Sequence, residues 1–140
     1  MKLVRAPGSY QAMTTSIYSV EQCAELCLRC YGACVRTAVD QSLKQSGSDE
    51  RKRCLRLMIN CADICKTAAD FILSSSDLYE KVCAVCAEVC DACAKRCEEM
   101  GGMDDCTQAC RTCAHSCRQV AASQSERLRS DQREAVGAPM

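Results

Sequence analysis

The chain has 140 residues and 16 of them are cysteine, about 11% of the total and far above the level of an ordinary soluble domain. Leucine, isoleucine, valine and phenylalanine together number only 23 and tryptophan is absent, which excludes an oily core of ordinary density, so disulfides, metal or both must help to hold the fold. Eighteen basic residues balance eighteen acidic ones, and this argues against nucleic acid or an anionic membrane as the main partner, because either favours a basic face.

The first eighteen residues are expected to form an N-terminal arm or a short helix, and the sequence leaves both open. Met1 to Ser19 contains neither the uninterrupted apolar run of a secretory signal nor a twin-arginine pair. No stretch of the chain approaches the roughly 20 apolar residues of a membrane span. We therefore expect a cytoplasmic protein, unless a leader was removed from a precursor. In the cytoplasm thiols stay reduced, and clustered cysteines bind metal more often than they form bridges.

Three breaks rich in glycine or serine divide the rest of the chain into four predicted helices. The breaks lie at Gly47, at Ser74 to Ser76 and at Gly101 to Gly102. The predicted helices span residues 19–45, 49–73, 77–100 and 104–122. Their alanine-rich, proline-free interiors favour helix throughout. Residues 19–122 are thus predicted to form one bundle, followed by a polar C-terminal tail at 123–140. The mixed charges of this tail indicate a solvated face, and the tail could extend the last helix or fray.

Start signals support all four helices, and in the last of them Asp104 and Asp105 open the first turn. Ser19 with Gln22 and Asp77 with Glu80 have the spacing of a capping box, in which the side chains and backbone amides of the first turn pair reciprocally. Ser48 stands directly before two acidic residues, which is typical of a helix N-terminus.

All sixteen cysteines lie on these helices, and each set forms a stripe. They are Cys23, Cys27, Cys30 and Cys34 on the first helix; Cys54, Cys61 and Cys65 on the second; Cys83, Cys86, Cys90, Cys93 and Cys97 on the third; and Cys106, Cys110, Cys113 and Cys117 on the fourth. Every spacing is three, four or seven, so each set covers an arc of about 80° at the a and d positions of heptads. Short connections make consecutive helices antiparallel neighbours. The sequence therefore predicts an all-α, antiparallel four-helix bundle with a cysteine-lined core.

Three uses of this sulfur are open. Cysteine could serve as a small buried hydrophobe, although packing gives no reason to select it sixteen times over alanine or valine. Cysteine could form a disulfide framework, but same-face neighbours on a helix have Cβ atoms about 5 to 6 Å apart, whereas a bridge needs about 3.5 to 4.5 Å. Bridges would have to run between helices, which a reducing compartment disfavours. Metal binding is the interpretation that the pattern favours.

Charge separates the candidate metals. Soft thiolates suit Cu(I), Zn(II) and iron–sulfur clusters. A Zn(II) ion with four thiolates keeps a net charge of about −2, so four such sites would bury a charge of about −8. Iron–sulfur clusters share this difficulty, and their ligands usually lie on loops around a bulky cofactor. One Cu(I) per thiolate leaves the core neutral, so the chemistry points to multiple Cu(I) ions, on the order of one per cysteine if thiolates bridge.

The repeats Cys83-Ala-Val-Cys-Ala-Glu-Val-Cys-Asp-Ala-Cys-Ala-Lys-Arg-Cys97 and Cys106-Thr-Gln-Ala-Cys-Arg-Thr-Cys-Ala-His-Ser-Cys117 resemble those of the bacterial copper storage proteins, over about residues 19 to 120. The chain is similar to the cytosolic branch of that family. The resemblance implies a non-enzymatic protein that holds many Cu(I) ions on thiolates inside each bundle. It also implies loading through one open end and association of bundles into a homo-tetramer. It names no copper-delivery partner.

The two ends of the predicted bundle differ. One end gathers the apolar residues Val20, Phe71, Ile72, Tyr79 and Val120. The other end gathers Cys54, Met58, Cys97, Met100, Met103 and Cys106. Thioethers bind Cu(I) softly and stay neutral, which suits ion exchange. We therefore predict a copper mouth at this second end, with Met58, Met100 and Met103 added to the sixteen cysteines as metal ligands; core filling is the alternative role of these methionines.

Other classes of function have weaker support. A thiol-redox protein would need CxxC pairs in a βαβ context, which is missing, and an iron–sulfur protein or a disulfide-stapled structural bundle remains the alternative to storage. His115 is the only histidine and lies on the face of its helix opposite Cys106, so it is expected to point outward. No catalytic constellation results, and no enzymatic activity is expected.

Overall fold

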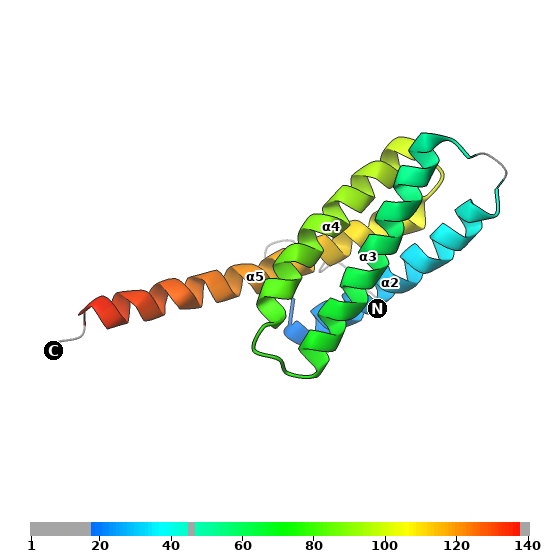
Figure 1. The fold of residues 1–140 in the computed structure, drawn as a ribbon. Coiled ribbons are helices and arrows are strands. Elements are labelled where there is room, and N and C mark those ends of the chain that lie inside the picture. The colour runs from blue at the N-terminus through cyan, green and yellow to red at the C-terminus, as the bar shows by residue number, and fades with distance from the viewer. Residues whose placement is uncertain (1–17, 45–46, 138–140) are drawn as a thin grey trace, which may run out of the picture.

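The computed structural model of the chain describes residues 18–44 and 47–137, and within them it contains helices and no strand. The helices are α2 (Val20–Ser42), α3 (Asp49–Leu73), α4 (Tyr79–Met100) and α5 (Asp104–Gly137). They pack as an antiparallel four-helix bundle (Figure 1). The predicted fold class is confirmed. The arm or short helix expected at residues 1–18 lies, apart from Tyr18, outside the described residues.

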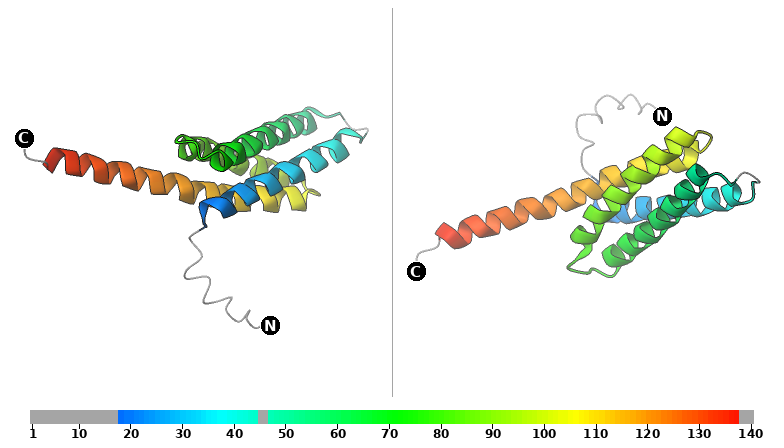
Figure 2. Two further views of the ribbon diagram at one scale, coloured as in Figure 1. Left: turned by 90° about the horizontal axis from the view of Figure 1, so that it is seen from below. Right: turned by 45° about the horizontal axis from the view of Figure 1, so that its top comes forward.

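The four helices form a closed square around one axis. Each helix packs against its neighbours in the chain, and α2 also packs against α5, which closes the ring. At one end of the bundle α2 and α4 finish while α3 and α5 begin; we call this the Met103 end. At the opposite end lie the start of α2, the α3–α4 connection and Ile72; we call this the Ile72 end. Figure 2 shows α5 running on past the Ile72 end, away from the other three helices.

Three of the four predicted helix starts are confirmed, since α5 also begins at Asp104 as expected. The backbone amide of Gln22 donates to Oγ of Ser19 at 3.0 Å, and the amide of Ser19 donates to Oε1 of Gln22 at 2.9 Å, which is a complete capping box. Oγ of Ser48 accepts from the amide of Arg51 at 3.1 Å and caps α3. These bonds satisfy amides that a helix start otherwise leaves unpaired.

The capping box predicted at Asp77 is wrong, because the preceding turn takes up one more residue than the sequence suggests. Ser75 adopts a left-handed backbone with φ of 57°, and the amide of Ser76 donates to the carbonyl of Phe71 at 3.0 Å. This is the pattern that ends many helices, although glycine is its usual residue. The hydroxyl of Ser76 then accepts from the amide of Leu78, which becomes the N-cap without a side-chain cap bond.

The end of α2, the start of α4 and the end of α5 differ from the predicted boundaries. Helix α2 ends at Ser42, before the predicted residue 45, and α4 begins at Tyr79 rather than at residue 77. Helix α5 continues to Gly137, so the polar segment after residue 122 extends the helix as one of the two outcomes left open above (Figure 1). The division of the chain into arm, bundle and tail stays a prediction.

The core contains little besides sulfur and methyl groups. The buried apolar residues are all sixteen cysteines, eight alanines, Met58, Met103, Ile72 and Val120. Alanines beside the cysteine stripes let the helix backbones approach closely, so the thiols of facing helices can touch. Within residues 18–44 and 47–137, no helix combines the length and the apolar character that crossing a membrane requires.

Two glycines make the turn that starts α5. Gly101 has φ of 80° and ψ of 156°, and Gly102 has φ of 78°. Residues with a Cβ hardly populate the first of these conformations. The amide of Gly101 donates to the carbonyl of Cys97 at 3.0 Å, so the chain reverses directly after the last α4 cysteine and brings Met103 over the end of the bundle.

Gly101→Ala should therefore lower the free energy of unfolding by about 1–3 kcal/mol, the usual cost of a strained backbone. A Cβ at Gly101 would meet no atom within 4 Å, so the loss would come from conformation rather than from a clash. Urea unfolding of the reduced apo protein, followed by circular dichroism, measures the change. Gly47→Ala is the control, because its backbone is not left-handed and its Cβ would meet only Cε of Lys52 at 4.0 Å. Equal changes in both variants would contradict this role of Gly101.

Candidate metal centre

The sixteen cysteine side chains form one continuous stack along the bundle axis, which we call the thiol column. None of the sixteen is more than 1% exposed. The stripes predicted on each helix therefore all face inward and meet, because a spacing of three and four residues keeps them on one helix face. The structure thus brings together every cysteine that the sequence proposes as a ligand.

Sulfur contacts join all four helices. Sγ of Cys23 lies 3.7 Å from Sγ of Cys117, which links α2 to α5. Sγ of Cys30 lies 3.8 Å from Sγ of Cys61, which links α2 to α3. Sγ of Cys65 lies 3.4 Å from Sγ of Cys90, which links α3 to α4. Sγ of Cys97 lies 3.7 Å from Sγ of Cys106, which links α4 to α5. These separations exceed the S–S bond length of about 2.05 Å, so the cysteines are free thiols.

Fourteen of the thiols fall into five overlapping groups in which all sulfur atoms lie within 4.8 Å of one another. Four groups hold four thiols and one holds three. They are Cys27, Cys86, Cys113 and Cys117; Cys30, Cys34, Cys61 and Cys110; Cys30, Cys65, Cys90 and Cys113; Cys34, Cys93, Cys106 and Cys110; and Cys23, Cys83 and Cys117. Cys54 and Cys97 belong to none of them. The shared cysteines make the column a chain of linked sites rather than a set of separate cages.

Hydrogen bonds between thiols lower the pKa of some cysteines in the column and raise the pKa of others. Cys106 shares a hydrogen bond with Cys110 at 4.0 Å and accepts one from Cys97 at 3.7 Å, and these bonds lower its pKa although burial opposes them. The hydrogen bond to Cys106 raises the pKa of Cys110 and that of Cys97, and burial raises both further. Burial and these bonds thus favour the protonated form of Cys97 and Cys110. A bound cation would have to displace their protons.

Cys54 lies at the Met103 end and differs from the thiols deeper in the column. Burial raises its pKa, and a hydrogen bond with Cys97 offsets part of the effect. With Cys97 it makes the last pair of thiols at this end, beyond the five groups.

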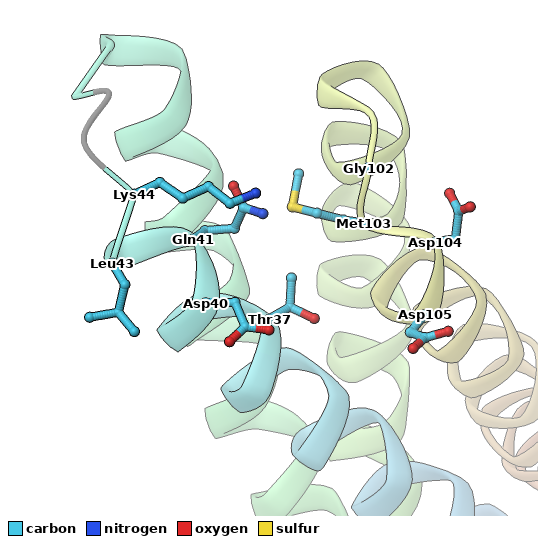
Figure 3. A pocket seen from close by; sticks show the side chains of 9 residues that line it. All are labelled: Thr37, Asp40, Gln41, Leu43, Lys44, Gly102, Met103, Asp104 and Asp105. Atoms are coloured by element: carbon cyan, nitrogen blue, oxygen red, sulfur yellow. The ribbon is translucent and has the colours of Figure 1, made fainter.

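The three methionines proposed as ligands lie in different surroundings at the same end. Met58 is fully buried within the core, at the stripe position where α3 lacks a cysteine. Met100 is half-buried and packs against the core. Met103 is 5% exposed and lines a pocket of about 590 Å³ between the end of α2 and the α4–α5 turn. Figure 3 shows the Met103 side chain pointing across this pocket toward Gln41 and Lys44.

Two polar residues near the column were missed in the sequence. Gln41 is 7% exposed and accepts a hydrogen bond from the guanidinium of Arg51 at the Met103 end. Ser116 is fully buried, and its hydroxyl lies 3.0 Å from the carbonyl of Cys113 and 3.5 Å from Sγ of Cys23. Heptad spacing could have found both, because Gln41 stands seven residues after Cys34 and Ser116 stands three after Cys113.

His115 points away from the column, as its helical position predicts. Its side chain is exposed, its ring meets that of Tyr18 edge to face at 5.7 Å, and its Nε2 lies 3.1 Å from Nε2 of Gln119. The backbone amide of Tyr18 donates to the side-chain Oε1 of Gln119 at 3.0 Å. The histidine thus packs against the segment that enters α2.

Comparison with known proteins decides the family. A family model described as copper storage protein matches residues 9–122, most of the chain and the whole thiol column. The chain belongs to the copper storage protein family. Its resemblance to that family in the cysteine repeats is thereby confirmed.

Solved structures support the same family. A crystal structure of a protein from Nitrosospira multiformis is 48% identical, covers 74% of this chain and 94% of its own, and superposes with a TM-score of 0.69. The Cu(I)-bound copper storage protein BsCsp3 is 35% identical over 72% of this chain and 96% of its own, with a TM-score of 0.67. The apo form of copper storage protein 3 from Bacillus subtilis is 37% identical over 74% of this chain and 99% of its own, with a TM-score of 0.61.

A curated relative is less informative about function. An uncharacterized cysteine-rich protein of Bacillus subtilis, YhjQ, is 36% identical over 66 residues, which is 47% of this chain. The match spans 60% of that relative's length.

The free thiols make a direct prediction. Apo protein purified without oxygen and unfolded in guanidinium should titrate sixteen thiols against a disulfide reagent with no reductant added, because no pair of sulfurs is at bonding distance. The folded protein should react far more slowly, since the thiols are buried. A count of twelve or fewer in the unfolded chain would instead favour the disulfide framework.

Proposed function

We propose that this copper storage family member binds and stores many Cu(I) ions on the thiolates of its column, without catalysing a reaction. The observation that carries the proposal is the column itself: sixteen buried thiols in contact along one axis, with no side-chain carboxylate or imidazole in the groups that could hold a metal among the described residues. A purely thiolate donor set suits Cu(I) and does not suit hard cations. The Cu(I)-bound relative of the same fold supports the choice of ion.

The net charge of the filled column favours a monovalent ion. Each Cu(I) that replaces one thiol proton leaves the site uncharged. Among the described residues no lysine or arginine is buried in the core to offset surplus thiolate, and Cys54, at the Met103 end, is influenced by the charges of Arg51 and Arg96. Neighbouring sulfurs 3.4–4.0 Å apart can bridge ions of low coordination number. Overlap between the groups allows one thiolate to bridge ions in two neighbouring groups. The cysteines that belong to two groups are Cys30, Cys34, Cys110, Cys113 and Cys117.

Copper would enter at the Met103 end. The Ile72 end holds Ile72 and Val120, which are both buried, and the partly buried Val20 and Tyr79, which pack against the core. The Met103 end instead offers the pocket beside Met103, then Met100, and then the pair Cys54 and Cys97. Neutral thioethers bind Cu(I) without a proton to displace, so they suit the first and last steps of exchange.

Cellular context follows from the same chemistry. A protein whose sixteen thiols must stay reduced fits the cytoplasm, where glutathione and thioredoxin keep them so. We also propose that the bundles associate into a homo-oligomer, which the resemblance to the family implies is a tetramer. The biological role would be to hold a toxic ion out of reach and to supply copper enzymes.

The experiment that tests this function is an anaerobic Cu(I) titration of the reduced apo protein against a tight chromogenic competitor. We expect capture of ions on the order of one per cysteine, because bridging thiolates let each sulfur serve more than one ion. Saturation at one or two ions, or no capture from the competitor, would refute storage. A variant with the five α4 cysteines replaced by serine should lose roughly a third of the capacity, which ties the ions to the column.

The entry route has its own test. The double substitution Met100→Leu and Met103→Leu should slow Cu(I) uptake several-fold while the final capacity stays unchanged, because leucine keeps the apolar volume and removes the soft donor. Stopped-flow mixing with a Cu(I) donor complex measures the rate.

Ile72→Leu at the opposite end is the matched control and should load at the original rate. Unchanged uptake in the double variant, or slowing in the control alone, would contradict entry at the Met103 end.

A further inference from the structure

The overlap of the thiol groups limits how many separate four-thiolate sites the column can hold. The group of Cys30, Cys65, Cys90 and Cys113 shares no member with the group of Cys34, Cys93, Cys106 and Cys110. Each of the remaining two groups of four contains at least one cysteine that already belongs to one of these two groups. The other combinations give the same result, so at most two groups of four can be occupied at once without sharing a sulfur.

The spacing within the groups matches a tetrahedral metal site. Four sulfurs each about 2.3 Å from a Zn(II) ion lie at the corners of a tetrahedron with edges of about 3.8 Å. Sγ of Cys110 lies 3.7 Å from Sγ of Cys30 and 3.7 Å from Sγ of Cys61, and the last two are 3.8 Å apart. These three sulfurs therefore already form one face of such a tetrahedron.

A second group has nearly the same geometry. Sγ of Cys27 lies 3.6 Å from Sγ of Cys117 and 3.7 Å from Sγ of Cys113, and the last two are 4.0 Å apart. Cys86 completes this group with its sulfur within 4.8 Å of the others, and the group shares no cysteine with that of Cys30 and Cys61. Little rearrangement is needed to enclose a tetrahedral ion in either place.

We propose that the thiol column also binds divalent ions that prefer four thiolates, Zn(II) above all, and that it saturates at two such ions per bundle. Each ion displaces four thiol protons and leaves a site with a net charge of −2, with no change in oxidation state. The low count follows from the sharing of cysteines. A monovalent ion of low coordination number escapes this limit because it does not need four thiolates, so the same column would hold few Zn(II) ions and many Cu(I) ions.

The charge predicts the order of preference. Two four-thiolate sites bury a total charge of −4 in a core with no cationic side chain, whereas Cu(I) leaves it neutral. Cu(I) should therefore displace the divalent ions. The proposal rests on the column described for the proposed function, but the number of divalent ions does not depend on whether Cu(I) is stored.

Co(II) serves as the probe, because it occupies zinc sites and its visible and charge-transfer bands distinguish four thiolates from other ligands. The full chain, reduced and without oxygen, is titrated with Co(II) and followed by absorption. We expect intense tetrathiolate bands that grow linearly and stop at two equivalents. Addition of Cu(I) should then bleach them.

Cysteine substitutions change the count in a way that only the overlapping groups predict. Cys110→Ser breaks two groups and leaves two that share Cys113, so one ion should remain. Cys113→Ser breaks the other two and should also leave one ion. The double variant should show no tetrathiolate band. Cys97→Ser removes an equally buried thiol that belongs to no group, and this matched control should keep two ions.

Far-UV circular dichroism of every variant verifies that the helices are present, and Zn(II) competition against the Co(II) bands extends the count to zinc. Absence of tetrathiolate bands in the unmodified chain, saturation well above two, or the same count in the double variant would overturn the proposal. Failure of Cu(I) to bleach the bands would count against the proposed storage function instead, and would leave the count of two intact.

Discussion

The contact between thiols of facing helices is the constraint on which the rest of the structure depends. Sulfur atoms 3.4–4.0 Å apart require helix backbones that approach closely, and the core permits this because it contains alanine and almost no branched aliphatic side chains. The same closeness couples the protons of the column: a thiol that donates to its neighbour lowers the neighbour's pKa and raises its own, as Cys97 does with Cys106. Fold, packing and acid–base behaviour therefore have a single origin.

That constraint also explains how a protein poor in large apolar residues can fold and bind many metal ions. In an ordinary bundle, leucine and isoleucine at the a and d positions fill the core and supply most of its stability. Here thiols occupy those positions. Bound ions can fill the space that aliphatic side chains would fill, and their bonds to sulfur can replace the lost packing. Cross-helix ion pairs such as Arg118 with Asp91 and Arg111 with Glu98 are exposed and contribute little to stability. Metal binding should stabilise the fold by contacting all four helices at once.

The regular part of this design was predictable from the sequence, and the irregular part was not. A spacing of three and four residues placed all sixteen cysteines on inward faces, and heptad reasoning correctly gave the antiparallel bundle. The turn before α4 was misjudged because Ser75 adopts a left-handed conformation that usually marks glycine, which moved the helix start past Asp77. Which thiols form groups of four depends on the rotation and offset of facing helices, and no spacing within one helix reveals that Cys54 and Cys97 belong to none of these groups. The burial of Ser116 beside Cys23 likewise arises from packing between α2 and α5.

The claim that the core stays neutral as it fills is tested most directly by counting protons. Reduced apo protein is titrated with Cu(I) in weakly buffered solution at neutral pH, and the base needed to hold the pH is measured alongside the copper bound. At saturation the account predicts about one proton released for each Cu(I) retained, because thiols that are protonated at the start each exchange one proton for one ion. A clear excess of protons over ions would mean surplus thiolate and a charged core, and would contradict the account.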